Sequence, residues 1–263
     1  LSDPSNALGI RRSRNKSHRY VLLPIHVPDG VERSVDLVRD NPGGFIIRCE
    51  KHGVPQARHR VIIMGIREDY MEPGVARIPG LEVSDSPARI EQAMAGIPPL
   101  RSGLSRKPDD GNQWFSVMEK ERHRVIRSLA GRLPEVAEIL SETQPASSLE
   151  RSSASYEPGR VGRLARELKG SSRIVLNHES RGHMDSDLGR YMFCAAFAFA
   201  KGHSPTNTDF PKALAPDHKN WNSGAFADRF RVQIPVMPSS TITSHLSKDG
   251  HAFIHWDPAQ CRS

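Results

Sequence analysis

Short apolar runs near the start of the chain predict strands. Residues 20–25, 45–47 and 61–64 have the sequences YVLLPI, FII and VIIM, and each run is rich in aliphatic or β-branched side chains. Pro24 interrupts the first run, which therefore predicts an edge strand or a strand end. Residues 31–39 show a weak helical period. A strand, a short helix and two more strands suit the last part of an α/β sheet, because so few strands cannot bury one another.

Beyond residue 67 the pattern predicts helices separated by irregular segments. Ser86 as N-cap with Pro87 in the first turn predicts a helix start, and Gly96 predicts the end of that helix. Residues 142–159 are rich in Ser and Pro and have no period, which predicts a linker or flexible loop. Further helices are predicted at 113–129, 160–169 and 187–201, and short β pieces at 173–176, 232–234, 241–245 and 252–256.

Composition adds a preference for an anionic partner. A chain of 263 residues suffices for one large or two modest domains. The hydrophobic fraction of 37%, with 20 Gly and 20 Pro, indicates a loop-rich protein or one that takes part of its core from elsewhere. The net charge of +7 favours nucleic acid first among polyanions. No apolar run approaches the ~20 residues of a membrane span, so no membrane partner is expected.

Histidine and cysteine positions give little support to a metal site. His245, His251 and His255 could be combined with Cys261 as zinc ligands, but their spacing matches no common ligand pattern. We therefore expect no metal. The three cysteines lie far apart and predict no disulfide framework, and free thiols fit a reducing cytoplasm. Two further histidines are expected to be loop or packing residues, His178 and His183.

The segment 44–66 places a charged turn between two predicted strands. Arg58 and Arg60 lie two residues apart immediately before the second strand. In an extended chain, such residues point to the same side and can present two guanidinium groups to one ligand. The planar donor groups of arginine suit a phosphate or a base edge. On local chemistry alone an ordinary basic surface turn is the favoured interpretation, because exposed arginine is common.

The amino-acid sequence around this turn resembles that of a known enzyme family. Residues 53–63, with the sequence GVPQARHRVII, resemble the Pro-Gln-x-Arg-x-Arg block of DNA (cytosine-5) methyltransferases. Several blocks that agree in order are stronger support than one short motif. Residues 177–183, with Arg190 and Tyr191, resemble the variable region of one bacterial or phage subgroup of the family. Residues 228–231, 238–245 and 248–255 resemble the close of its target recognition domain, and residues 260–263 resemble the opening of the next conserved block.

The resemblance implies roles for the residues of the block. In the family, a cysteine thiolate adds to C6 of a flipped cytosine, and S-adenosylmethionine methylates C5. Arg60 would contact the flipped cytosine and the adjoining backbone, and Arg58 would hold a phosphate. Gln56 would order the turn, although plain turn formation is an equally good interpretation of this residue.

The resemblance also implies contacts to double-stranded DNA from the recognition domain. Thr241 or Thr243 would help to seat that domain in the major groove, although a strand threonine is about as good an interpretation of each. Arg229 and Arg231 are further candidate DNA contacts. Base-specific contacts are expected from loops between residues 177 and 230, with no assignment of side chains to bases.

Three blocks of the family are missing from the sequence. The cofactor loop Phe-x-Gly-x-Gly, the Glu-Asn-Val block and the Pro-Cys pair are absent, since none of Cys49, Cys194 and Cys261 follows a proline. S-adenosylmethionine is therefore expected as cofactor of a complete enzyme, without binding residues here. The chain begins at Leu1 and stops at Ser263 without a closing element, so we expect a fragment that is inactive alone and lacks an N-terminal catalytic half.

The expected fold class is α/β. Residues 1–75 are predicted to form the C-terminal part of a Rossmann-like, S-adenosylmethionine-dependent methyltransferase sheet, and residues 76–263 a mixed, loop-rich target recognition domain with helical insertions. The missing half would belong to the same polypeptide or to a separate partner chain. The alternative is a non-catalytic DNA-binding remnant or a subunit of a split methyltransferase. A cytoplasmic location is expected, in a prokaryotic cell or for a phage-encoded protein.

Overall fold

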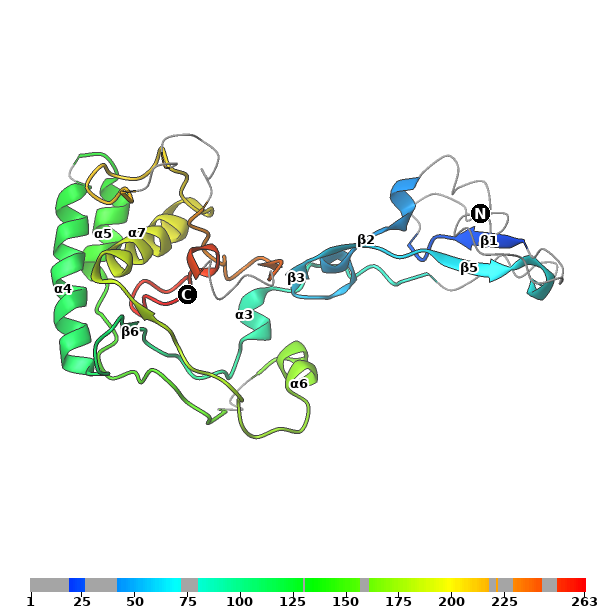
Figure 1. Ribbon diagram of the computed structural model, residues 1–263, viewed down its shortest axis with the longest axis horizontal. Helices are drawn as coiled ribbons and strands as arrows, with labels where there is room; N and C mark the ends of the chain where they lie inside the picture. The colour runs from blue at the N-terminus through cyan, green and yellow to red at the C-terminus, as the bar shows by residue number, and fades with distance from the viewer. Residues whose placement is uncertain are drawn as a thin grey trace. The chain divides into compact units, whose positions relative to one another are not determined.

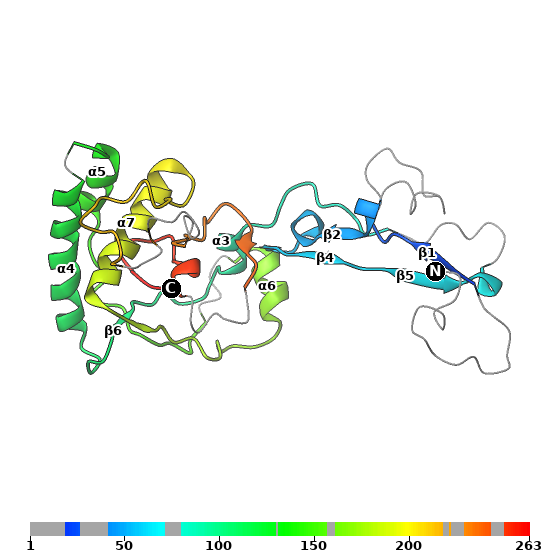
Figure 2. The ribbon, with the colours of Figure 1, turned by 45° about the horizontal axis from the view of Figure 1, so that its top comes forward.

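The computed structural model describes residues 19–26, 42–71, 80–129, 131–156, 161–217, 221, 229–242 and 250–263. The chain divides into two compact units, Leu1–Pro87 and Ala88–Ser263, whose elements can be followed in Figures 1 and 2. The helix expected at 31–39 lies outside the described residues, and so does the expected domain boundary after residue 75. In the described part of the chain, no helix is long and apolar enough to cross a membrane.

The first unit contains short antiparallel strand pairs. Strand β1 (Tyr20–Leu23) pairs with β5 (Met64–Arg67), and β2 (Ile46–Arg48) pairs with β4 (His59–Val61). As predicted, the first strand ends before Pro24. The remaining elements of this unit are the 3-10 turns η1 (Pro42–Phe45), η2 (Cys49–His52) and η3 (Glu68–Tyr70), and the two-residue strand β3 (Gln56–Ala57).

The prediction of one strand at residues 61–64 is wrong. Strand β4 ends at Val61 and β5 begins at Met64, because the chain changes its partner from β2 to β1 between them. The backbone N–H of Ile62 still donates to the carbonyl of Phe45 at 3.1 Å. The apolar run between the strands is exposed, with Val61 at 64%, Ile62 at 43% and Ile63 at 60%. The β-branched pattern was therefore a correct indicator of extended backbone but not of burial.

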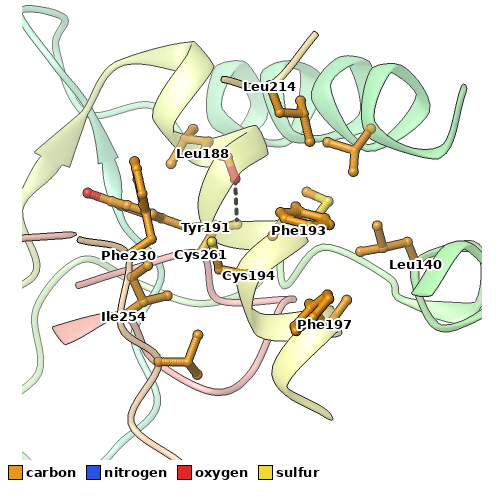
Figure 3. Close-up of a cluster of buried hydrophobic side chains, with 14 of the residues drawn as sticks. Leu140, Leu188, Tyr191, Phe193, Cys194, Phe197, Leu214, Phe230, Ile254 and Cys261 are labelled. Atoms are coloured by element: carbon orange, nitrogen blue, oxygen red, sulfur yellow. Dashed lines mark hydrogen bonds between the residues drawn. The ribbon is translucent and has the colours of Figure 1, made fainter. Parts of the chain in front are cut away.

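The core of the second unit is a three-helix cluster. Helices α4 (Gly111–Ser128), α5 (Pro134–Glu142) and α7 (Asp185–Lys201) pack against one another, as Figure 1 shows. Helix α7 is buried almost all round, which is typical of a central helix. Figure 3 shows its contacts with the C-terminal segment, where the thiol of Cys261 donates to the carbonyl of Leu188 at 3.2 Å. The fully buried side chains include Trp114, Met118, Leu140, Leu188, Phe193, Leu214 and Ile254.

The long predicted helices are confirmed, with somewhat different starts. Helix α4 begins two residues before the predicted 113, where the Asp110 carboxylate accepts hydrogen bonds from the N–H groups of Asn112 and Gln113. Helix α7 begins at Asp185 instead of residue 187, and α6 (Arg163–Lys169) lies within the predicted 160–169. Helix α5 was not predicted, although it has Pro134 in its first turn and buries residues spaced by four.

The predicted helix start at Ser86 is wrong. Helix α3 (Ile90–Ala93) begins after Arg89, and the Ser86 carbonyl instead accepts a hydrogen bond from the hydroxyl of Ser84. The N–H of Ile90 donates to the carbonyl of Met237, and the next N–H donates to the carbonyl of residue 235. These distant carbonyls satisfy the first amides of the helix, so no serine cap is needed.

The predicted β pieces of the second unit are mostly reduced to single contacts. Ile174 forms one bridge with Ser155, and Val232 forms one parallel bridge with Ile254. The turn η5 (Gly250–Phe253) occupies the first two residues of the predicted 252–256 strand. The only two-residue strands of this unit in the described ranges are β6 (Gly103–Leu104), β7 (Gly182–His183) and β8 (Ser239–Ser240), of which β6 and β7 pair in parallel.

The side chain of Gln233 replaces part of a backbone ladder between residue 233 and the segments around 240 and 252. The Gln233 amide nitrogen donates to the Ser240 hydroxyl and to the carbonyl of Ala252, and its oxygen accepts from the Ser240 N–H. The side-chain amide thus makes the bonds that a backbone ladder would otherwise make. Every sheet among the described residues has two strands, so a wider Rossmann-like sheet stays a prediction for a longer protein.

Candidate nucleic-acid interface

The Pro-Gln-x-Arg-x-Arg segment forms a closed loop between η2 and β4. The N–H of Cys49 donates to the carbonyl of Arg58 at 3.3 Å, and the N–H of Arg58 donates to the carbonyl of Gln56 at 2.8 Å. Gly53 ends η2 with a φ of 80°, a conformation that side chains with a Cβ rarely adopt. Backbone bonds therefore fix this loop, and Gln56 contributes to it through its carbonyl.

The two arginines differ in their backbone setting. Arg60 lies inside β4 opposite Ile47, and its exposed side chain donates to the carbonyl of His59 at 2.7 Å. Arg58 is half-buried and precedes the first residue of β4. Side chains alternate between the two faces only within a strand, and Arg58 precedes the first residue of β4. That Arg58 and Arg60 point to the same face therefore stays a prediction. Within the described ranges, neither arginine forms an ion pair with a carboxylate.

The carboxylate nearest in sequence to this loop, that of Glu50, is in contact with the ring of His59. Nε2 of His59 lies 2.8 Å from Oε1 of Glu50. Burial opposes ionisation of Glu50, but a backbone hydrogen bond and the His59 ring outweigh it, so the pKa of Glu50 lies below its ordinary 4.5. Glu50 is therefore an anion at neutral pH, and it pairs with His59 and leaves the guanidinium groups available to an external phosphate. Sequence reasoning missed this pair, because no motif or period links residues nine apart in a loop.

The candidate DNA contacts of the second unit lie on a segment held by η5. The N–H of Arg231 donates to the carbonyl of His251, and the N–H of Ile254 donates to the carbonyl of Arg231. These bonds fix the backbone of Arg231 while its side chain is exposed. Gln233 ties the same stretch to Ser240, which directly precedes the half-buried Thr241. Arg229 is half-buried, and Thr243 lies outside the described residues.

The buried histidines of the second unit are packing residues. The ring of His183 packs edge-on against Tyr191 with centroids 4.9 Å apart, and the Tyr191 hydroxyl lies 2.9 Å from Nδ1 of His251. Burial lowers the pKa of His183 to about 4 and that of His255 to about 3, so both rings are neutral at pH 7. In the described part of the chain, no three His, Cys, Asp or Glu side chains are arranged to hold a metal ion.

The cysteines of the second unit are unsuited to nucleophilic attack. Cys194 and Cys261 are buried, and burial raises the pKa of both thiols well above the ordinary value. A thiol held neutral and covered by side chains does not reach a substrate carbon. The remaining cysteine, Cys49, is half-buried in η2 and is free of a disulfide.

The chain is similar to a known methyltransferase. Type II methyltransferase M.Bpa9945I of Bacillus paralicheniformis is 26% identical over 220 residues, which correspond to 80% of this chain and 47% of that enzyme. The chain thus spans about half the length of this relative. No model of a protein family matches the chain. No solved structure matches it either.

The similarity is not confined to one unit. It covers 80% of the chain, and this share exceeds the 176 residues from 88 to 263, so it necessarily includes residues of both units. A relationship to methyltransferases is therefore supported for the loop of Arg58 and Arg60 and for the helical unit within one continuous polypeptide.

Proposed function

We propose that the chain is part of a DNA (cytosine-5) methyltransferase, which transfers a methyl group from S-adenosylmethionine to C5 of cytosine in a specific DNA site. The observation that carries this proposal is the loop of residues 53–63. Its two arginines have no carboxylate partner within the described ranges, and it occurs in a chain that is similar to a Type II methyltransferase over most of its length. The positive net charge fits double-stranded DNA as partner.

The arginines act on the flipped base and its backbone in this proposal. Flipping costs a few kcal/mol of lost stacking and pairing, which contacts to the extruded nucleotide must offset. Arg60, exposed on β4, donates hydrogen bonds to the cytosine carbonyl and balances the negative charge that develops when a nucleophile adds to the ring. Arg58 holds a phosphate beside it, and the backbone of Gln56 keeps the loop closed.

The methyl donor and the nucleophile come from outside this chain. S-adenosylmethionine supplies the methyl group in the complete enzyme, but the sequence contains no Phe-x-Gly-x-Gly loop to hold it. Cys194 and Cys261 are enclosed in the helical core. This chain alone is therefore proposed to be inactive, and activity requires an N-terminal catalytic half, either in the same polypeptide or as a partner subunit. A prokaryotic or phage-encoded enzyme of this kind acts in the cytoplasm.

The second unit reads the DNA in this proposal. Arg229, Arg231 and Thr241 lie on the segment braced by η5 and Gln233, and Thr243 follows it. An exposed arginine on such a backbone suits contacts in a DNA groove, because the segment does not have to become ordered when the arginine side chain binds.

A second candidate function is DNA binding without chemistry. The enclosed thiols favour it, because a remnant or a subunit of a split enzyme needs no nucleophile of its own. The coding sequence on either side of residues 1–263 separates the two. An adjoining Pro-Cys block supports the enzyme, whereas start and stop signals at these positions support the remnant or split subunit.

At the bench, the chain is mixed with mixed-sequence duplex DNA and tritiated S-adenosylmethionine. We expect the duplex to bind, with an affinity that falls as salt rises, and no transfer of label. Transfer that survives replacement of all three cysteines by serine would contradict the proposed chemistry, and absence of any DNA binding would contradict both candidate functions.

A further inference from the structure

An apolar pocket of about 340 Å³ lies in the second unit between α3 and α6. Its walls are aliphatic, and Ala165 on α6 is fully buried against it, while Leu168 and Ile174 stand at its opening with more than half of their surface exposed. This volume falls in the range of small-molecule sites, roughly 300–1,000 Å³. None of the proposed roles of Arg58, Arg60 or Thr241 uses this pocket.

One side of the pocket is closed by an aromatic ring under a cation. Nζ of Lys169 lies 3.2 Å from the ring centroid of Tyr156, and the Tyr156 hydroxyl donates to the carbonyl of Ala95 at 3.4 Å. The hydroxyl bond anchors the ring to the segment after α3, and the cation–π contact holds the lysine at the opening. The ring is therefore held in place in the pocket lining, with Lys169 over one of its faces.

Lys169 brings a positive charge to the pocket lining, and it has no ion-pair partner among the described residues. On α6, Glu167 pairs with Arg163, whereas Arg166, Lys169 and the nearby Arg173 form no ion pair in the described part of the chain. Desolvation and repulsion from Arg173 lower the pKa of Lys169. An anion placed at the opening relieves this repulsion.

The residues that line the pocket indicate which class of ligand it would bind. Aliphatic walls and a fixed aromatic ring suit a flat apolar body, and the cations beside them suit a phosphate. A nucleotide combines the two. The hydroxyl of Ser172 in the lining is already bonded to the backbone of Ile174, and Tyr156 is bonded to Ala95, so little polar surface is left to distinguish one base from another.

We propose that this pocket holds an unstacked nucleotide of bound DNA, with its base against Tyr156 and its phosphate at Lys169. The proposal rests on the DNA partner of the proposed function and adds a second nucleotide site, separate from the cytosine that reacts. It binds any base, and it takes an unpaired nucleotide more readily than a paired one, because extrusion from a duplex costs stacking and pairing energy.

The test uses the whole 263-residue chain and duplexes that carry one 5-iodouracil, either paired or as a single-nucleotide bulge. After ultraviolet irradiation, the cross-linked peptide is mapped by mass spectrometry. We expect cross-links at Tyr156 or at residues 168–176, with a higher yield for the bulge. Shuffling the sequence around the bulge should leave that yield unchanged.

Paired variants separate the pocket from general charge effects. Lys169→Met should lower the pocket cross-link roughly tenfold, as expected for loss of one stacking and phosphate site, whereas Lys212→Met removes an exposed lysine elsewhere and should not. Leu168→Glu places a negative charge at the opening and should act like Lys169→Met. Its control is Phe199→Glu on α7, another exposed apolar position of the same unit.

The outcomes distinguish this proposal from the proposed function. Duplex binding with cross-links only outside these peptides overturns the pocket site and leaves the DNA partner intact. Absence of duplex binding overturns the proposed function itself. If free 5-iodo-deoxyuridine monophosphate labels the pocket and neither duplex does, the site belongs to a free nucleotide and the assignment to DNA is wrong.

Discussion

Nε2 of His59 lies 2.8 Å from Oε1 of Glu50, and this pair joins the two sides of the loop that carries Gln56 and Arg58. One partner lies in η2 and the other is the first residue of β4. The contact adds a side-chain link to a loop that is also closed by backbone hydrogen bonds of Cys49 and Arg58.

The stability that the contact between Glu50 and His59 contributes should decrease as the pH falls. The folded pKa of Glu50 is lowered, so its contribution to stability is present above the ordinary 4.5 and is lost as the pH falls through the folded value. At pH 7, Glu50→Gln should destabilise the loop by about 1 kcal/mol or less. Amide exchange of Cys49, whose N–H closes the loop, measures it. Glu68→Gln on exposed η3 is the control, and a difference that persists in strong acid would argue against this contact.

Arg60 should matter more for catalysis than for DNA binding. In an enzyme completed with the missing blocks, Arg60→Ala should lower the methylation rate by about 10² to 10³, as for other preorganised donors. Duplex affinity, measured by fluorescence anisotropy, should change only a few-fold. Lys51→Ala, an exposed cation of η2, should affect neither strongly. Equal losses of rate and affinity would reduce Arg60 to a phosphate contact.

Acid should destabilise the helical unit through His183. Its folded pKa of about 4 lies below the ordinary 6.5, so its contribution is present above pH 6.5 and is lost as the pH falls from 6.5 to 4. The shift corresponds to on the order of 3 kcal/mol at most. Urea unfolding at a series of pH values should show a shallower loss for His183→Gln than for the unchanged chain. Parallel curves would show that another group controls the acid transition.

The packing of α4 against α7 should be sensitive at Gly189. A Cβ added there would lie 2.5 Å from Oε2 of Glu121, which is buried and paired with Arg124 at 2.6 Å. Gly189→Ala should therefore destabilise the unit by about 1–3 kcal/mol despite the better helix propensity of alanine. Thermal unfolding measures the change. Gly162→Ala meets open space, so it should cost only the preference for glycine at the N-cap of α6, and equal effects at both positions would contradict the packing argument.

Elements of the fold could be predicted from the sequence where the interactions that form them lie within the same short segment. Helices α4 and α7 were predicted from sequence because the signals lie within each segment, namely the apolar positions of α4 and the acidic start and alanine-rich body of α7. The start of α3 was not, because the carbonyl of Met237 satisfies its first amide from far along the chain. The run at 61–64 was assigned to one strand because its composition is uniform, whereas the partner strands change within it.

The candidate site residues remain predictions from the sequence, and the geometry around them could not be predicted from it. The spacing of Arg58 and Arg60 alone favoured an ordinary basic turn, and the resemblance of residues 53–63 to the Pro-Gln-x-Arg-x-Arg block made them candidate site residues. The contact between Glu50 and His59 and the anchoring of Tyr156 beneath Lys169 depend on loop closure, which leaves no period in the sequence.

Val61, Ile62 and Ile63 leave three β-branched side chains in water where β4 gives way to β5. An extended segment of this composition is a ready template for addition of another strand, including one from a neighbouring molecule. Chaperones and proteases continuously remove chains that expose such segments. We therefore expect the cellular lifetime of this chain to be short unless other polypeptide covers this run.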